Sequence, residues 1–315
     1  MDLFLDGGYG MDKYGLLKEN GDMIYKKQIS VFAEASLDTE DMPLFEGKRY
    51  YIGEEALMEE SQNILNVIDY KQHEKTAPLS LWNVLQKENI KKEEINNIYI
   101  GLSLAQKEYA PAFIKRMSKF KVNGETFDFT GKIKLIPQGV GAKYAIDHFY
   151  YNENHKETYA IIDIGQLTVD VANVISGKIR SENAQGSEHE GVIKIIQQIQ
   201  EYIAREFSEV ISIKEAQEVM LTGKYNLFGV HDLSSVIDKF KEDYSVYVIN
   251  MLKQRHRNIF KKYPKIYIVG GGSYYISKET LKKSEGISFD TIVFPEDAEY
   301  YNVIGSMVFS KLNRG

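Results

Sequence analysis

The sequence contains no cysteine among its 315 residues. Disulfides, thiolate metal sites and cysteine nucleophiles are therefore excluded, and the absence fits a reducing compartment. Long apolar runs are also missing, because no stretch approaches the roughly 18 residues that a membrane-spanning helix needs. The N-terminus lacks the basic segment and apolar core of a signal peptide. From these absences we expect a cytoplasmic protein that makes no contact with membranes.

An excess of positive charge is absent as well. The chain carries 39 Lys and Arg residues against 45 Asp and Glu residues, a formal net charge of -6 at pH 7. A surface built for uniform nucleic-acid binding needs the opposite balance, so direct DNA binding is not expected, although a local basic patch stays open. A mean hydropathy of -0.35 with 43% hydrophobic residues indicates a globular chain that is long enough for two domains.

Several common site motifs are missing too. There is no GxxxxGK(S/T) and no GxGxxG that opens a helix after a strand, so the P-loop and Rossmann interpretations lose their main motif. The six histidines form no HExxH or other paired metal spacing. We expect them to have structural roles, at the surface or partly buried.

What the sequence does contain is an alternation of strand-like and helix-like segments, which indicates an α/β protein. Glu46-Gly47 predicts a hairpin turn. A polar stretch at 151–157 (YNENHKE) marks the expected change of domain. The hydrophobic periodicity predicts strands at Ile98–Leu104, Tyr159–Ile164 and Ile266–Val269, and helices at 109–120, at Val192–Phe207 and from Leu233 to about Tyr263.

One pattern occurs twice along the chain. In LFLDGGYGMDKYG and in TYAIIDIGQLTVDVANV, an apolar strand ends in an aspartate, Asp6 or Asp163, which is followed by glycine and a second strand-like run. Glycine lets a turn approach an anion, and its backbone N–H groups can point at phosphate oxygens. A carboxylate beside phosphate needs a cation between them, so both aspartates fit the water-mediated holding of Mg²⁺. Lys13 would place a positive charge on the phosphates.

A third glycine cluster, IYIVGGGSYYI, ends a strand at Gly270, Gly271 and Gly272. Adenine or ribose could lie against this backbone, with Tyr275 nearby. Taken singly, an Asp-Gly after a strand is more typical of an ordinary hairpin turn, and the glycine triplet is equally typical of a plain loop. Two strand-Asp-x-Gly hairpins followed by a strand-GGG turn, in this order, favour a nucleotide site.

These motifs resemble those of the actin superfamily. DGGYGMDKYG is similar to the phosphate 1 motif, which runs D-x-G-x-G-M-x-K-x-G in eukaryotic actin, and IDIGQLTVD is similar to phosphate 2. IVGGGSYYI resembles the adenosine motif, IPQGVGAKYAI the first connecting segment and EDAEYYNVIGSMVFS the second connecting helix. The motifs follow the family order over almost the whole chain. Their spacing resembles the ParM or StbA plasmid-segregation actins and the archaeal ParM-like actins.

The resemblance implies an actin-like ATPase fold of two RNase H-like domains, with ATP or ADP and Mg²⁺ in the cleft between them. It implies domain I at 1–150, with a C-terminal helix at about 298–315 packing back on it, and domain II at 151–297. It also implies homopolymeric filaments. The implied nucleotide-binding residues are Gly7, Gly8, Tyr9, Gly10, Lys13, Gly165, Gln166, Thr168, Lys214, Gln217, Gly270, Gly271, Gly272 and Tyr275, with Asp6 and Asp163 on the metal through water.

The sequence departs from the family pattern at two positions. Many relatives have a second glycine in phosphate 2 where this chain has Gln166. Gln138 stands where ParM and the DnaK-type chaperones have a glutamate and actin has a glutamine. A glutamine can orient a water but cannot accept its proton at neutral pH, so the implied catalytic set of Gln138, Asp6 and Asp163 predicts slow ATP hydrolysis. Without the family context, Gln138 is an ordinary polar residue before a helix.

The superfamily leaves several functions open. A DnaK-type chaperone needs a further peptide-binding domain, a sugar kinase an acceptor pocket and a catalytic aspartate, and MreB commonly a membrane element, none of which we expect here. A filament-forming ATPase, used for plasmid segregation through a DNA-bound adaptor protein, therefore leads over a monomeric kinase or a nucleotide-sensing protein. The basic run RHRNIFKK at 255–262 is expected to be a solvated helix face rather than a contact for DNA or an acidic partner.

Overall fold

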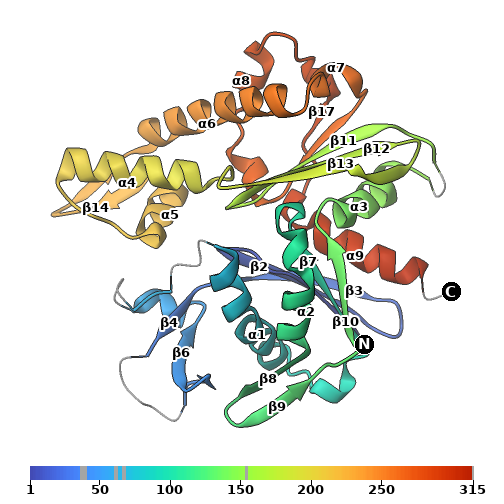
Figure 1. The fold of residues 1–315 in the computed structure, drawn as a ribbon. Coiled ribbons are helices and arrows are strands. Elements are labelled where there is room, and N and C mark those ends of the chain that lie inside the picture. Colours follow the sequence, from blue (N-terminus) through green and yellow to red (C-terminus); the bar gives the residue numbers. More distant parts are fainter. Residues whose placement is uncertain (36–40, 60–62, 66–68, 153–154, 314–315) are drawn as a thin grey trace. The chain divides into compact units, whose positions relative to one another are not determined.

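The computed structural model describes residues 1–35, 41–59, 63–65, 69–152 and 155–313. The chain divides into two compact units (Figure 1). Unit 1 comprises Met1–His155, Ala184–Gly186 and Glu299–Gly315, and unit 2 comprises Lys156–Asn183 and Ser187–Ala298. Of the predicted boundary stretch at 151–157, residues 153 and 154 lie outside the described part.

Unit 1 is built on a five-stranded sheet in the order β10-β7-β1-β2-β3. Strands β1, β2 and β3 form an antiparallel meander, while β7 and β10 run parallel to β1. Their bounds are β1 Asp2–Asp6, β2 Met11–Leu17, β3 Met23–Ile29, β7 Asn97–Leu102 and β10 Ile133–Pro137. The strand predicted at 98–104 therefore ends two residues early, because the Ser103 hydroxyl caps a 3-10 turn by accepting from Ala105 N–H.

Side chains alternate between the two faces of this sheet, as the pleat requires. Leu3 and Leu5 join a core with the helices α1 (Tyr70–Lys87) and α2 (Ala110–Ser118). Phe4 lies on the opposite face and stacks on Tyr99 with 4.7 Å between ring centroids. Helix α9 (Tyr301–Leu312) covers that face, where the Ser310 hydroxyl contacts the Tyr99 hydroxyl. A strand buried on both faces reads as a continuous apolar run, as the opening of this sequence does.

Two small sheets complete unit 1. Strands β4 (Phe32–Glu34), β6 (Lys48–Ile52) and β5 (Leu44–Phe45) pair antiparallel, and β8 (Lys119–Val122) pairs with β9 (Glu125–Asp128). Glu46 and Gly47 join β5 to β6 with φ of 50° and 79°. The predicted hairpin turn at Glu46-Gly47 is therefore confirmed.

Unit 2 contains a sheet with the same plan. Its order is β13-β12-β11-β16-β17, in which β11 is antiparallel to β12 and parallel to β16. The bounds are β11 Tyr159–Ile164, β12 Thr168–Ile175, β13 Lys178–Glu188, β16 Ile266–Val269 and β17 Ile292–Val293. Strands β11, β12 and β16 thus occupy the places that β1, β2 and β7 occupy in the first sheet. The repeat predicted from the sequence is present as a repeat of topology.

The helices of unit 2 follow the predicted apolar spacing, with one correction. Helix α4 (Ile193–Phe207) buries the stripe at 195, 196, 199 and 203. The single helix predicted from Leu233 to about Tyr263 is wrong, because α6 (Ser234–Arg255) ends before α7 (Ile259–Lys262) begins. Asn258 between them has φ of 66°, a left-handed conformation that asparagine tolerates and an α-helix cannot contain. The basic run at 255–262 is therefore not one helix face.

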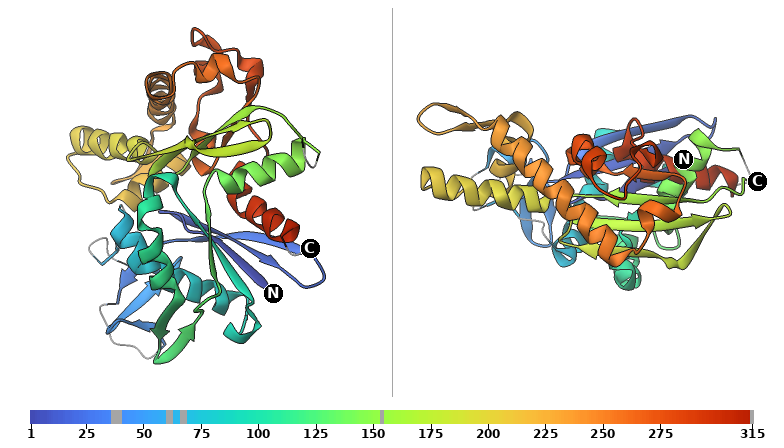
Figure 2. Two further views of the ribbon diagram at one scale, coloured as in Figure 1. Left: turned by 45° about the vertical axis from the view of Figure 1, so that its right-hand side comes forward. Right: turned by 90° about the horizontal axis from the view of Figure 1, so that it is seen from above.

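The remaining elements of unit 2 lie around these helices (Figures 1 and 2). Helix α5 (Ile213–Thr222) leads into a short hairpin of β14 (Lys224–Asn226) and β15 (Val230–Asp232), and α8 (Lys278–Lys283) packs on α6. Within the described residues, no helix is both long and apolar enough to cross a membrane.

In unit 1, α3 (Val140–Tyr150) and α9 cross at two glycines. A Cβ at Gly305 would overlap the Gly141 carbonyl, and one at Gly141 would lie 2.7 Å from the Asn302 carbonyl oxygen. The helix backbones therefore touch directly. Side chains at this crossing would force the two helices apart.

We expect Gly305→Ala to destabilise the protein by about 3 kcal/mol, because the added methyl group has no space at the helix crossing. Urea unfolding followed by circular dichroism measures this loss. The matched control is Lys311→Ala, an exposed position on the same helix. Equal unfolding midpoints for Gly305→Ala and the wild type would contradict the packing described for α3 and α9.

Candidate functional site

Asp6 ends β1 and is the centre of the candidate site in unit 1. Its side chain is buried, and it pairs in register with Lys13 across the β1–β2 hairpin. The Gln138 amide Nε2 donates to Asp6 Oδ1 at 2.6 Å. Burial raises the pKa of Asp6, while the charge of Lys13 and hydrogen bonds from Gln138 and Asn302 lower it. The carboxylate is thus only partly compensated by the protein's own groups.

Parallel strands bring these side chains together. Asp6 ends β1, Gly101 lies near the end of β7 and Gln138 follows β10, so all three lie at the carboxyl edge of the sheet. This is the edge at which α/β proteins commonly bind ligands. A Cβ at Gly101 would lie 2.6 Å from Asp6 Oδ1, so the glycine makes room for the carboxylate. The proximity of Asp6, Lys13 and Gln138 is observed, and their roles stay predictions.

Asn302 of α9 is a site residue that the sequence analysis did not identify. Its Oδ1 accepts hydrogen bonds from the backbone N–H groups of Gly139 at 3.1 Å and Ala142 at 3.2 Å, at the start of α3. The same side chain contacts Asp6. Asn302 therefore fixes the segment that carries Gln138. An asparagine 163 residues away from Gly139 in sequence gives no local signal for this role.

In the glycine turn of unit 1, one N–H group already has a partner within the chain. Gly8 N–H donates to Asp12 Oδ1 at 3.1 Å, and Ser80 and Gln28 donate to the other Asp12 oxygen. Asp12 is buried, and this burial raises its pKa against those hydrogen bonds. A Cβ at Gly8 would overlap the Met11 carbonyl, so the tight turn itself requires this glycine.

His73 of α1 lies directly beneath the same turn. A Cβ at Gly7 would lie 2.6 Å from His73 Nε2, and the Tyr9 ring lies 5.2 Å from the imidazole. The Tyr9 hydroxyl accepts from Gln106 Nε2 at 2.5 Å, while the Gly10 carbonyl accepts from the Ser30 N–H at 3.0 Å. Burial lowers the pKa of His73 to about 4. The histidine is neutral and packs against the turn, a structural role as expected, but it is buried rather than at the surface or partly buried.

The second hairpin has its own buried aspartate. Asp163, near the end of β11, is 6% exposed. The turn that follows is closed by Gly165 N–H donating to the Thr168 carbonyl at 2.9 Å. Gln166, which replaces the second glycine of many relatives, directs its carbonyl to the Ile193 N–H of α4 at 2.8 Å. The turn therefore forms without that glycine.

The glycine triplet packs against the end of β11. Gly270 has φ of 82°, and a Cβ on it would overlap Asp163 Oδ1. A Cβ on Gly272 would overlap Ile164 in the same way. Gly271 opens the 3-10 turn that ends at the half-buried Tyr275. Close packing thus explains Gly270 and Gly272 and places the triplet beside Asp163. The contact of the triplet with adenosine stays a prediction.

Lys214 and Gln217 lie three residues apart on α5 and are both half-buried. This spacing puts them on one helix face. Burial lowers the pKa of Lys214, against the raising effect of Glu218 and Glu215. Their assignment to the adenine stays a prediction.

In the described part of the chain, no group of three or more histidines, aspartates or glutamates is arranged to hold a metal ion. The described residues therefore form no site in which protein side chains alone would bind a metal. A single carboxylate such as that of Asp6 is chemically suited to a hydrated Mg²⁺, because this ion keeps most of its waters. The raised pKa of the buried Asp6 shows a carboxylate that a cation would stabilise.

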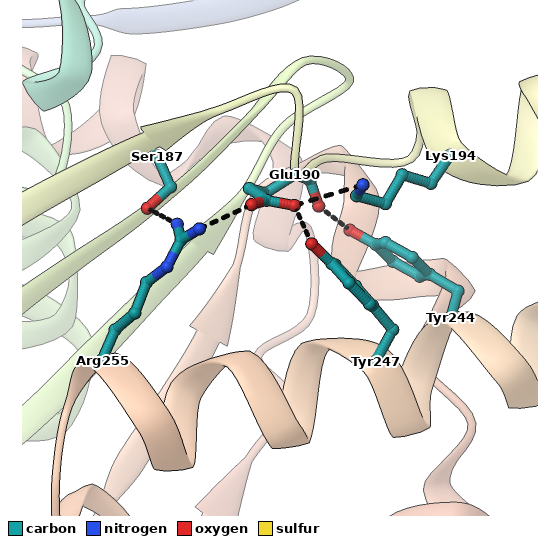
Figure 3. A network of polar contacts seen from close by, with 6 residues as sticks. All are labelled: Ser187, Glu190, Lys194, Tyr244, Tyr247 and Arg255. Atoms are coloured by element: carbon teal, nitrogen blue, oxygen red, sulfur yellow. Dashed lines mark hydrogen bonds and ion pairs between the residues drawn. The ribbon is translucent and has the colours of Figure 1, made fainter.

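A second feature that the sequence did not reveal is a network around Glu190, just before α4 (Figure 3). Its carboxylate accepts from Arg255 at 2.8 Å and from the Tyr247 hydroxyl, and pairs with Lys194 at 3.3 Å. The backbone N–H of Glu190 donates to the Leu167 carbonyl at 3.1 Å. This network therefore ties the second glycine turn to α4 and α6. Arg255, which belongs to the basic run at 255–262, is therefore paired with Glu190.

We expect His73 to make stability depend on pH. Its pKa is about 4 in the folded protein and near 6.5 when unfolded, so stability is complete above pH 6.5 and declines as the pH falls toward 4. The stability of the wild type relative to His73→Leu should fall by up to about 3 kcal/mol between pH 7 and pH 4. Urea titrations across this range test it, with the exposed His148→Leu as control. Parallel curves for the wild type and His73→Leu would contradict a neutral buried His73.

Comparison with known proteins gives a family match to part of the chain. Residues 161–283 match the model of the archaeal actin homologue MreB-like, C-terminal family. No curated protein matches the sequence.

Solved structures match over nearly the full length. The archaeal actin homologue Ta0583 has a TM-score of 0.72 at 22% identity, covering 99% of both chains. A 15-stranded ParM filament from Clostridium botulinum has a TM-score of 0.75 at 17% identity, covering 99% of both chains. MreB 5 of Spiroplasma citri, bound to AMPPNP, has a TM-score of 0.66 at 15% identity, covering 99% of this chain and 96% of that one. This chain therefore has the actin-like ATPase fold, and the resemblance to ParM-type and archaeal actin homologues is confirmed.

Proposed function

We propose that this protein binds and slowly hydrolyses ATP and assembles into filaments. The observation that carries the proposal is the repeated hairpin, in which a buried aspartate lies at the last or the last but one position of the central strand of each sheet and a glycine turn follows. Two such hairpins, one in each of two equally ordered sheets, would supply two carboxylates and two turns to a polyphosphate. The archaeal homologue Ta0583, similar in fold at 20% identity, has also been solved in complex with ADP.

The proposed chemistry of the phosphates follows from charge. Lys13 would place its ammonium on the phosphates, and Asp6 and Asp163 would hold Mg²⁺ through its waters. When bound, this ion would neutralise charge on the β- and γ-phosphates. Gly7, Gly10, Gly165 and Thr168 would supply the turn contacts, whereas Gly8 N–H is already directed at Asp12. The glycine triplet, Tyr275, Lys214 and Gln217 would contact the adenosine.

Gln138 would position the water that attacks the γ-phosphate. It already donates to Asp6 through Nε2, which leaves its Oε1 as an acceptor for a water O–H. An amide does not take up the proton at neutral pH, so the proposal gives slow turnover. Slow hydrolysis would limit the lifetime of a filament rather than its formation.

Filament assembly in plasmid segregation is the cellular role that the resemblance favours. The ParM relative solved as a 15-stranded filament supports self-association. The net charge of -6 favours a DNA-bound adaptor protein over direct DNA contact. A cytoplasmic location follows from this role.

A monomeric kinase or nucleotide sensor of the same fold is the alternative. Light scattering after addition of Mg-ATP separates the two, because only the filament proposal predicts polymer.

We expect Lys13→Ala to weaken ATP binding by roughly 10- to 100-fold, since a hydrogen bond to a charged group contributes about 1.5–3 kcal/mol. Isothermal calorimetry with Mg-ATP measures the affinity. The control is Lys27→Ala, because Lys27 faces Lys13 in register on β3 but forms an ion pair with Glu299. An unchanged affinity in Lys13→Ala would remove the phosphate assignment.

For Gln138→Ala, we expect phosphate release to slow by about 100-fold while ATP binding and assembly persist, because only the water loses its position. Sedimentation and phosphate release are measured on the same samples, with the exposed Gln86→Ala as control. Equal turnover in Gln138→Ala and the wild type would show that Gln138 is structural. A parallel loss of ATP affinity would show that it acts only by holding Asp6.

A further inference from the structure

The second glycine turn, at 165–168 in unit 2, takes the place of an N-terminal cap for α4. Four successive backbone N–H groups, at 190–193, donate to the three carbonyls at 165–167 over distances of 2.8 to 3.2 Å. In the described part of the chain, α4 has no side-chain cap. The N–H groups at the start of this helix are therefore satisfied by the carbonyls of the turn.

The turn presents its own N–H groups on the side away from α4. All described peptide bonds are trans, and a trans peptide directs its C=O and its N–H to opposite sides. The N–H groups of Gln166 and Leu167 thus point away from α4, and neither has an acceptor among the described residues. A turn whose carbonyls are paired and whose N–H groups are free is suited to an anion.

Gly191 lets the start of α4 approach the turn this closely. A Cβ on Gly191 would lie 2.5 Å from the carbonyl oxygens of both Gly165 and Gln166. Any side chain at this position would push the segment 190–193 away from the turn. The direction of the turn therefore depends on where this segment is held.

Glu190 holds the segment 190–193 to α6 (Figure 3). Its buried carboxylate accepts from Arg255 Nη2 at 2.8 Å and from the Tyr247 hydroxyl. Its backbone carbonyl accepts from the Tyr244 hydroxyl at 3.0 Å, and Lys194 adds a second positive charge 3.3 Å from the carboxylate. The start of α4 is thus fixed through both the backbone and the side chain of Glu190.

The charges of this network favour a role in position over a role in stability. Burial raises the pKa of Glu190, but the Tyr247 hydroxyl and the charges of Lys194 and Arg255 outweigh it and hold the pKa below its usual range. A buried ion pair contributes little net stability, because desolvation cancels much of the attraction. It does fix geometry, since Arg255 also donates to Ser187 Oγ at 2.7 Å and is held at two points.

We propose that Glu190 and Arg255 are positioning residues for phosphate, which act through the second glycine turn. Their ion pair holds the segment 190–193, and this segment holds the carbonyls of the turn. The carbonyls in turn set the direction of the Gln166 and Leu167 N–H groups, which donate to the polyphosphate of the nucleotide. This role rests on the proposed function, since it concerns the same phosphate site.

The test compares phosphate-dependent with phosphate-independent binding. Arg255→Met removes the charge of a side chain that is 42% exposed, so the core stays closed, and Arg255→Lys keeps the charge. Tyr247→Phe removes only the hydroxyl that donates to Glu190. The matched control is Arg257→Met, an exposed arginine of the same basic run without an ion pair among the described residues. Calorimetry measures the affinities for Mg-ATP and for adenosine, and urea unfolding measures stability.

We expect Arg255→Met to weaken ATP binding by about tenfold, the contribution of one hydrogen bond to a charged group, while adenosine binding equals that of the wild type. Tyr247→Phe should show a smaller loss in the same direction. Arg255→Lys should bind ATP more tightly than Arg255→Met, because lysine keeps the charge beside Glu190. The ratio of the two affinities is measured on folded protein, so a loss of stability alone does not change it.

An unchanged ratio of ATP to adenosine affinity in Arg255→Met, even with a lower unfolding midpoint, would overturn the positioning role and leave the proposed function standing. An equal fall of the ratio in Arg257→Met would overturn it too, since the effect would then come from net charge. If Arg255→Met does not fold, the ratio in Tyr247→Phe decides in the same way. Absence of ATP binding by the wild type would overturn both the positioning role and the proposed function.

A double variant shows whether the two residues act as one unit. The loss of ATP affinity in Glu190→Gln with Arg255→Met should be smaller than the sum of the losses in the two single variants, because either substitution already breaks the pair. Additive losses would show that Arg255 acts on the phosphate without Glu190 and would overturn the proposal.

Discussion

A buried carboxylate at the end of a central strand is the constraint on which unit 1 depends. Asp6 is 8% exposed and carries a charge that burial penalises. The neighbouring strand gives up a side chain at Gly101 to make room for it, and Gln138 and Asn302 donate hydrogen bonds to it. An apolar residue at position 6 would avoid the cost of burying a charge. Binding of a cation beside Asp6 would offset this cost.

Glycines serve packing as much as anion binding in this molecule. Gly8 closes the first turn, Gly270 admits Asp163, and Gly141 with Gly305 lets α3 and α9 touch. Gly270, Gly141 and Gly305 meet atoms from another element, whereas Gly8 meets the Met11 carbonyl of its own turn. Gly270 belongs to the motif that resembles the adenosine motif, and it is also the residue that makes room for Asp163. In unit 1 this space is made by Gly101, which lies outside the motifs.

Local sequence predicted the elements and the two hairpins, since the strand at Tyr159–Ile164 and the helix at Ile193–Phe207 follow from apolar periodicity. It could not predict contacts between residues that are far apart in the sequence. Asn302 acts on α3 from the other end of the chain, and His73 supports a turn 66 residues before it. Apolar spacing continues through the break at Asn258 and therefore predicts one helix, whereas the asparagine itself is a signal for a turn. The Glu190 network, likewise, joins α4 to α6 through contacts without a sequence motif.

The proposed function assigns Asp6 and Asp163 to the same metal-bound nucleotide. A double-mutant cycle of Asp6→Asn and Asp163→Asn, measured by calorimetry for ATP with and without Mg²⁺, tests it most directly. The account predicts one ATP per chain, a loss of affinity in each single variant that needs Mg²⁺, and a double variant whose loss is smaller than the sum. Additive losses, or losses that are equal without Mg²⁺, would contradict a shared metal site.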